Sequence, residues 1–129
     1  MAWSVDYDEA LRLVVLTYSG QTTGQDIKDA AAARIAMGRK RGVTDFLIDT
    51  RDVLVDESAT VDIYDVPDKM YVDKAVQRVS RIAILEPRSP DSRHLVEFFA
   101  NACTNRGWLA KRFTDRTEAL EWLHEEQSP

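Results

Sequence analysis

The sequence predicts an α/β domain with a mixed, mostly parallel sheet of four or five strands and helices packed on it. Short apolar runs alternate along the chain with amphipathic segments of helical spacing, a pattern typical of strands joined by helices. Two of the runs, 46–48 and 82–85, are apolar without interruption, as expected for parallel strands covered on both faces. The first two strand-like segments follow each other directly, which predicts an initial hairpin.

The hairpin is expected from residues 3–7 and 11–18, with a turn at 8–10 between them. The first segment alternates apolar Trp3, Val5 and Tyr7 with polar residues. The second is apolar on both faces, which indicates an interior strand that Gly20 ends. Thr23 and Asp26 then form a capping-box-like helix start. Small and apolar residues line one side of that helix, and Gly42 ends it. Residues 43–48 are then expected to form the third strand.

The second half of the chain alternates helices and strands. Residues 59–76 are amphipathic, and Pro67 predicts a short helix to about Asp65 followed by a second one from Pro67. Residues 81–85 are the fourth strand, and Pro90 opens a helix that ends at Gly107. Residues 109–113 are the last strand, and Asp115 caps a terminal helix. The predicted order is β-β-α-β-α-β-α-β-α.

Composition bounds the class of protein. The 129 residues suit a single domain spanning 1–129, and 44% apolar with 30% charged residues is ordinary for a compact globular chain. A net charge of -5 argues against a non-specific nucleic-acid or anionic-membrane partner. No apolar stretch reaches the length of a membrane span, and the first residues lack a signal-peptide pattern. We therefore expect a cytoplasmic protein without membrane insertion, in which Cys103 is a small buried thiol.

Recognisable catalytic chemistry is missing from the sequence. The five glycines do not cluster as a phosphate-binding loop, and no Gly-x-Ser-x-Gly motif occurs. His94 and His124 stand alone, each at a helix position expected to be exposed, so we predict no metal site. We assign no catalytic residue and no cofactor, and we expect a protein that is not an enzyme.

Residues 46–63, FLIDTRDVLVDESATVDI, concentrate carboxylates and hydroxyls after an apolar run. Asp49 is expected at the carboxyl end of a parallel strand, where open α/β sheets place ligands. The stretch has three readings, namely an active site, a phosphorylation switch, or a strand and solvated loop that lead into a capped helix. The sequence shows no catalytic partner for these carboxylates, which favours the third reading.

The chain resembles the STAS-like family, the fold of bacterial anti-sigma-factor antagonists, and more closely an uncharacterised bacterial branch of it. The resemblance covers most of the chain and rests on five strings, "DIYDVPDKMY" at 62–71, "RIAIL" at 81–85, "FF" at 98–99, "NRGW" at 105–108 and "FTDRTEALEWL" at 113–123. It implies a switch loop in which a partner kinase phosphorylates a serine. Asp49 matches the aspartate that ends the buried strand, and Asp56, Ser58 and Thr60 occupy the place of the phosphorylated motif. The paired serine of that motif is here Ser58 followed by Ala59, and Thr60 replaces its glycine.

Three functions remain open from the sequence. The leading one is a small non-enzymatic binding or regulatory domain that acts on an unknown protein partner or a small apolar ligand. It is expected to be a homodimer, with Trp3 and Phe98 as candidate contacts. The second is the phosphorylatable switch at residues 56–60. The third is a lipid-binding or unknown enzymatic pocket near Asp49, with Arg51, Tyr64 and Tyr71 as candidate contacts.

Overall fold

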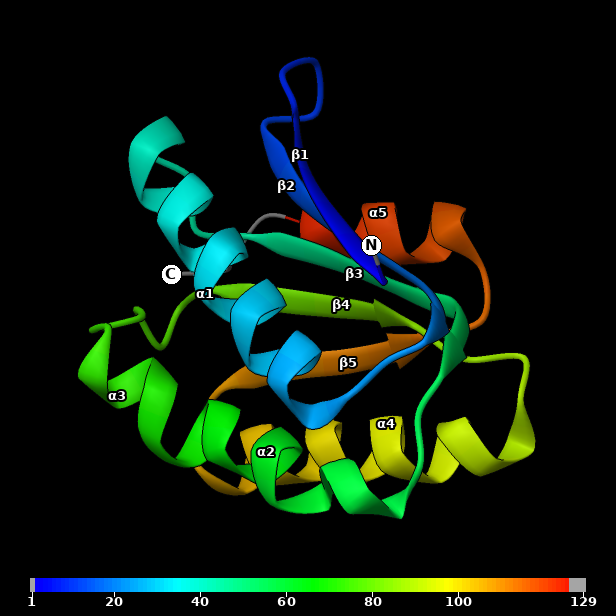
Figure 1. Ribbon diagram of the computed structural model, residues 1–129. Helices are drawn as coiled ribbons and strands as arrows, with labels where there is room; N and C mark the ends of the chain where they lie inside the picture. The colour runs from blue at the N-terminus through cyan, green and yellow to red at the C-terminus, as the bar shows by residue number, and fades with distance from the viewer. Residues whose placement is uncertain (1, 126–129) are drawn as a thin grey trace.

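Five strands form one sheet in a computed structural model that describes residues 2–125. The strands lie in the order in which they occur along the chain, and only the first pair is antiparallel. Figure 1 shows the sheet crossing the molecule. Their bounds are β1 (Trp3–Asp8), β2 (Leu13–Gln21), β3 (Phe46–Leu54), β4 (Arg81–Leu85) and β5 (Leu109–Phe113). The predicted hairpin, the interior position of β2 and the mostly parallel sheet are confirmed.

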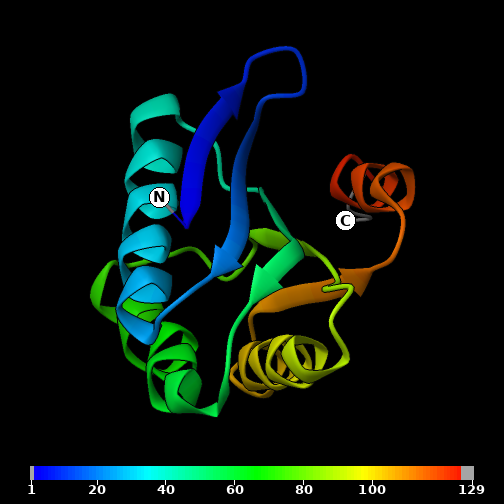
Figure 2. The ribbon, with the colours of Figure 1, turned by 45° about the vertical axis from the view of Figure 1, so that its right-hand side comes forward.

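Helices cover the two faces of the sheet unequally. The longest ones, α1 (Gly24–Arg41) and α4 (Pro90–Asn105), lie on one face together with α2 (Thr60–Asp65). Within residues 2–125, α5 (Arg116–Leu123) is the one helix that packs on the other face, against β4 and β5, and Figure 2 shows it on the side away from the other helices. The sheet thus lies between two helical layers, and α5 covers only part of the second face of the sheet.

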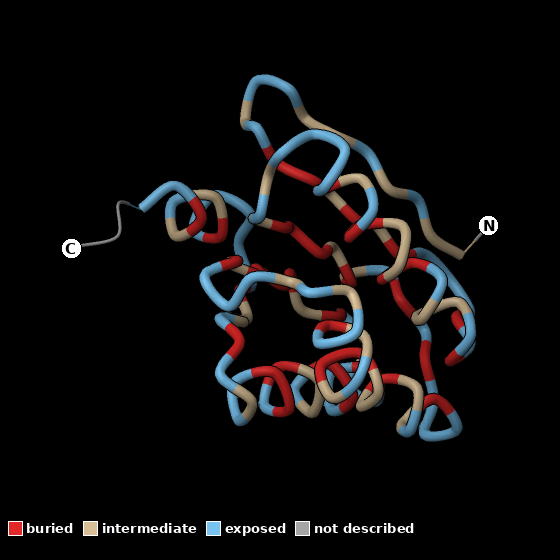
Figure 3. The backbone as a smooth tube through the Cα atoms, turned by 90° about the vertical axis from the view of Figure 1, so that its left-hand side faces the viewer, coloured by how far each residue is buried: buried red, intermediate tan, exposed pale blue. Residues whose placement is uncertain are grey.

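Two apolar clusters follow from this arrangement because successive strand residues point to opposite faces. Ile48 and Ile84 belong to the larger cluster under α1, α2 and α4, whereas Leu47 and Leu85 belong to the smaller one under α5. All four side chains are buried, as Figure 3 shows for the central strands in general. The uninterrupted apolar runs at 46–48 and 82–85 therefore contribute side chains to both apolar clusters.

The predicted helix ends are confirmed. The Thr23 hydroxyl accepts the Asp26 N–H at 3.1 Å, and the Asp26 carboxylate accepts the Thr23 N–H at 2.9 Å, which completes the capping box of α1. Gly42 ends α1 with φ of 68°, a left-handed conformation that glycine adopts without strain. The Asp115 side chain accepts the Thr117 N–H at the start of α5.

The bounds of the second and third strands differ from the prediction. Residues 11 and 12 belong to the hairpin turn, and β2 continues past Gly20 to Gln21. The third strand, expected at 43–48, begins at Phe46 and runs on to Leu54. After an irregularity between Thr17 and Ser19, β3 pairs with β2 again, and this pairing keeps the polar residues 49–52 in the sheet. The expected solvated loop is therefore mostly strand.

Pro67 lies in the first turn of a new helical segment, directly after the end of α2 at Asp65. The backbone stays helical from 57 to 73 through a 3₁₀ turn (Glu57–Ala59), α2, a π-helical turn (Val66–Met70) and α3 (Tyr71–Asp73). Proline cannot donate the N–H that an α-helix needs at this point. The Val66 N–H bonds the Ile63 carbonyl instead, and the Tyr71 N–H bonds the Val66 carbonyl across the widened turn. The predicted end near Asp65 and the new segment at Pro67 are therefore confirmed, but the two segments follow each other without a gap in the helical backbone, which the sequence did not predict.

Candidate functional site

Asp49 and Arg51 form a closed pair on the uncovered face of the sheet. They lie two residues apart on β3, on the face of Leu47, so both side chains point away from α1 and α4. Arg51 donates three hydrogen bonds to the Asp49 carboxylate, from Nε at 3.0 Å, from Nη2 at 2.9 Å and from its backbone N–H at 3.1 Å. Because both carboxylate oxygens are engaged by one neighbour, Asp49 is poorly placed to act on a bound molecule.

This pair predicts a pH dependence of stability. Burial alone would raise the pKa of Asp49, but the hydrogen bonds from Arg51 outweigh it and lower the pKa below the ordinary aspartate value. A lowered folded-state pKa stabilises the protein above about pH 4 and loses that contribution as the pH falls through the folded pKa. Asp49→Asn should therefore lower the free energy of unfolding at about pH 7 by at most about 1 kcal/mol, because the pair is part-exposed.

The measurement is urea unfolding of wild type and Asp49→Asn at neutral and at acidic pH. The difference between the two proteins should shrink as the pH falls below about 4. A difference that stays constant or widens at acidic pH would contradict the inferred direction of the pKa shift.

The serine and threonine of the predicted switch lie at the start of the 57–73 helix. The Asp56 carboxylate accepts the Ser58 N–H at 2.9 Å and also accepts the Ser58 hydroxyl hydrogen, and these bonds lower the pKa of Asp56. The Thr60 hydroxyl donates to the Glu57 carbonyl at 2.7 Å. Ser58 is exposed and Thr60 is half-buried. Asp56 is therefore the residue that caps the helix, and Ser58 is reachable from solvent.

Beside Ser58 lies an open groove of about 790 Å³ at the carboxyl ends of the central strands. Its walls come from the end of β3, the start of the 57–73 helix and the first turns of α4. Three acidic residues line it, Asp56, Glu57 and Asp91, and no lysine or arginine does. We call this feature the acidic groove.

Ser92 ties the two walls of the acidic groove together. Its side chain is 1% exposed, and its hydroxyl accepts the Val55 N–H at 3.1 Å and donates to the Val55 carbonyl at 3.4 Å. These bonds join the first turn of α4 to the residue after β3 and satisfy a backbone that has left the sheet. The Ser92 side chain thus links the two walls of the acidic groove through hydrogen bonds.

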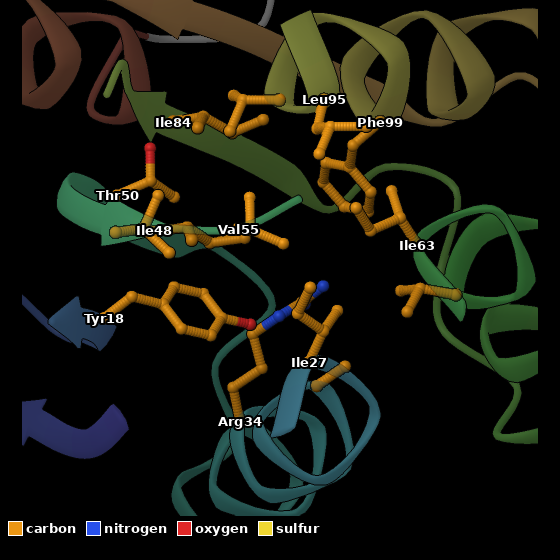
Figure 4. Close-up of a pocket in the computed structure, with 14 residues that line it drawn as sticks. Tyr18, Ile27, Arg34, Ile48, Thr50, Val55, Ile63, Ile84, Leu95 and Phe99 are labelled. Carbon is orange, nitrogen blue, oxygen red and sulfur yellow. The ribbon is translucent and has the colours of Figure 1, made fainter. Parts of the chain in front are cut away.

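A second hollow lies inside the larger apolar cluster, between the sheet and the helices α1, α2 and α4 (Figure 4). This cavity has a volume of about 60 Å³, and most of its lining is apolar. The exception with a full charge is Arg34 of α1, which is 1% exposed. The sequence prediction did not single out Arg34. The signal was its position seven residues after Ile27 and four before Gly38, on the buried side of the helix.

The structure does not bring together the four residues of the predicted pocket near Asp49. Tyr71 is fully buried in the large cluster, on the opposite side of the sheet from Asp49 and Arg51. Tyr64 stacks on Phe98 with ring centroids 6.1 Å apart, and the guanidinium of Arg106 lies 4.4 Å from the Tyr64 ring centroid. Asp49, Arg51, Tyr64 and Tyr71 line neither the cavity nor the acidic groove.

The two candidate dimer contacts lie far apart in the fold. Trp3 is half-buried on the edge strand β1, and Phe98 is half-buried against Tyr64 on α4. Both pack partly against the apolar cluster of the same chain. The homodimer stays a prediction.

Other site classes find little support among residues 2–125. No group of three or more His, Cys, Asp or Glu side chains there is placed to hold one metal ion. No helix within the same residues has the length and apolar character needed to cross a membrane. Cys103 is buried as predicted, and burial raises the pKa of its thiol to about 12. A thiol in that environment stays protonated and inert.

Known structures match 95% of the chain, although no family model and no curated protein matches its sequence. An uncharacterized protein of the DUF3478 family with a SpoIIAA-like fold, from Shewanella loihica PV-4, is 19% identical and has a TM-score of 0.58. That match covers 95% of this chain and 92% of the other. The anti-sigma factor antagonist SpoIIAA in its unphosphorylated form is 18% identical with a TM-score of 0.60, covering 95% and 96%. The chain therefore has the STAS-like, SpoIIAA-like fold that the sequence resemblance predicted.

Proposed function

We propose that this STAS-like domain is a regulatory protein that acts by binding a protein partner in its acidic groove. The observation that carries the proposal is the groove itself. Its charged lining residues are acidic, and Ser92 joins its two walls by hydrogen bonds. Charge complementarity selects a partner surface rich in lysine or arginine. The likeness to an anti-sigma factor antagonist supports a role in protein binding through the fold alone.

Charge reversal in the groove tests this proposal. Glu57→Lys/Asp91→Lys reverses two exposed lining charges and leaves the Asp56 cap in place. Glu9→Lys/Glu121→Lys, at exposed positions away from the groove, produces the same change in net charge. Immobilised wild type and the control variant should capture the same protein from native cells, and the groove variant should not. Equal capture by all three proteins would contradict the proposal.

Phosphorylation of Ser58 is a second candidate, favoured by its exposed hydroxyl at the rim of the groove. A phosphoserine has no hydroxyl hydrogen to donate to Asp56, and it would set a near-dianion beside Asp56 and Glu57. We therefore infer that modification would disturb the helix start and deepen the negative charge of the groove. SpoIIAA, which has an unphosphorylated form, supports this candidate by fold likeness.

Intact-mass analysis of the protein from its native cells should show a fraction heavier by one phosphoryl group. That fraction should vanish in Ser58→Ala and persist in Thr60→Ala, because the Thr60 hydroxyl is half-buried and engaged with Glu57. Absence of a modified fraction under every growth condition would contradict the proposed phosphorylation. Loss of the modified fraction in Thr60→Ala but not in Ser58→Ala would assign the phosphorylation to Thr60.

Self-association belongs to the same proposal. We infer a homodimer through the edge strand β1 and its half-buried Trp3, or through the α4 surface near Phe98. Sedimentation at micromolar concentration should then show a dimer that Trp3→Ser or Phe98→Ser weakens. A monomer at all concentrations would end this part of the proposal.

A further inference from the structure

Arg34 carries a buried positive charge without a carboxylate partner among the described residues. Its Nη2 donates to the Tyr71 hydroxyl, but its Nε and Nη1 have no acceptor within residues 2–125. The neutral oxygen of Tyr71 does not neutralise the charge, since burial raises the pKa of that phenol. A buried charge is strongly unfavourable unless an opposite charge and hydrogen bonds compensate it.

The surroundings of Arg34 hold its head group in place. The centre of the guanidinium lies 4.9 Å from the Phe46 ring centroid and 5.2 Å from that of Tyr71, both within cation–π range. Figure 4 shows the guanidinium directed into the cavity, with the Tyr18 hydroxyl pointing toward it from the sheet. The free donors of Arg34 therefore face a preformed space.

The rest of the cavity is apolar. Ile48, Ile63 and Leu95 are among its walls, and the Thr50 hydroxyl, which also lines it, already donates to the Leu85 carbonyl at 2.5 Å. One water-sized group occupies about 10–15 Å³ of cavity volume. The cavity of about 60 Å³ therefore has room for a ligand of roughly four to six non-hydrogen atoms. The occupant should thus be small, with one anionic end and an apolar remainder.

We propose that the cavity binds a short-chain monocarboxylate of roughly four to six non-hydrogen atoms, with its carboxylate on Arg34 and its alkyl part against the apolar walls. One arginine matches one carboxylate, for which the guanidinium is well suited. A phosphate or a dicarboxylate would place further charged oxygens against aliphatic side chains, where they lose their hydration. The proposal is independent of the partner-binding function, although the cavity and the acidic groove share the walls Val55 and Leu95.

Calorimetric titration of the whole protein tests this inference with acetate, propionate and butyrate as sodium salts. Sodium chloride at equal ionic strength and the neutral isostere butyramide are the ligand controls. At least one carboxylate should bind saturably at one site per chain and raise the melting temperature. Chloride and butyramide should do neither, because chloride lacks the apolar part and butyramide lacks the charge.

Two variants and one matched control locate the binding. Arg34→Met replaces the buried charge by an apolar chain of similar length and should weaken carboxylate binding by about tenfold or more. Ala31→Leu fills the cavity from the same helix without changing any charge, and it should also abolish binding. Arg39→Met, at an exposed position of α1, should bind like wild type.

Several results would overturn the inference. The first is that wild type shows no saturable carboxylate binding. The second is that butyramide or chloride binds as tightly as butyrate. The third is that Ala31→Leu, with its cavity filled, still binds a carboxylate. Should Arg34→Met fail to fold, the ligand controls on wild type and the Ala31→Leu titration decide the question. None of these measurements involves a protein partner, so failure here leaves the acidic-groove proposal to its own test.

Discussion

Replacing Tyr71 with alanine is expected to lower the free energy of unfolding by about 3–5 kcal/mol, as measured by urea denaturation. Its side chain is 0% exposed and packs edge-on against Trp108, with ring centroids 5.2 Å apart and planes at 82°. Removing the ring leaves a cavity beside Arg34 and Trp108, and it takes away both a cation–π surface and the hydroxyl acceptor of Arg34.

Tyr71→Phe is the matched control, because it keeps the ring and deletes only the hydroxyl. It should cost about 1–3 kcal/mol, the penalty for leaving one more buried Arg34 donor without an acceptor. If Tyr71→Phe proved as damaging as Tyr71→Ala, the polar contact would outweigh the packing, against this prediction. A cost below about 1 kcal/mol for Tyr71→Ala would contradict its place in the core.

Replacing Trp108 with alanine is expected to destabilise the protein by a similar amount, about 3–5 kcal/mol. Trp108 is 4% exposed, and its indole N–H donates to the Pro67 carbonyl at 3.3 Å. That carbonyl belongs to the π-helical turn, where the ordinary helix pattern is interrupted. The guanidinium of Arg78 covers the ring at 3.9 Å from its centroid.

Trp108→Phe separates the two contributions of this residue in the same urea experiment. It keeps most of the apolar packing but removes the donor to Pro67, so it should be milder than Trp108→Ala. Because Trp108 and Tyr71 touch, the double alanine variant should cost less than the sum of the two single changes. Strict additivity would mean that the two rings do not form one packing unit.

The sequence predicted those parts of the fold in which local pattern and tertiary context agree. The strands at 81–85 and 109–113 match the structure at both ends, because polar or turn-forming residues flank each of them. The caps at Thr23 and Asp115 are local hydrogen-bond patterns that adjacent residues complete by themselves.

Features that depend on distant segments were out of reach. The continuation of β3 past Asp49 depends on its renewed pairing with β2 at Ser19–Gln21, which overrides a polar local sequence. The continuous helix through Pro67 depends on the π-helical turn and on Trp108, 41 residues away. The closed pair of Asp49 and Arg51 depends on their shared strand face, which a loop would not have imposed.

The acidic groove contains some residues that the sequence singled out and others that it did not. Residues 56–60 do border an open groove at the carboxyl edge of the sheet, as the general rule for α/β sheets suggests. The opposite wall comes from α4, some 30 residues later, and the sequence gives no sign that Asp91 and Ser92 face Asp56 there. Helical spacing places Arg34 on the buried side of α1, but the cavity beside it is formed by residues from distant segments and does not follow from periodicity.

The most direct test of the acidic groove is the dissociation constant of the captured partner with three purified proteins. Wild type and Glu9→Lys/Glu121→Lys should bind alike, and Glu57→Lys/Asp91→Lys should bind about tenfold or more weakly. Added salt should weaken the wild-type complex and have less effect on the groove variant. Equal affinity of the groove variant and the control, at low and at high salt, would contradict the proposal that this surface holds the partner.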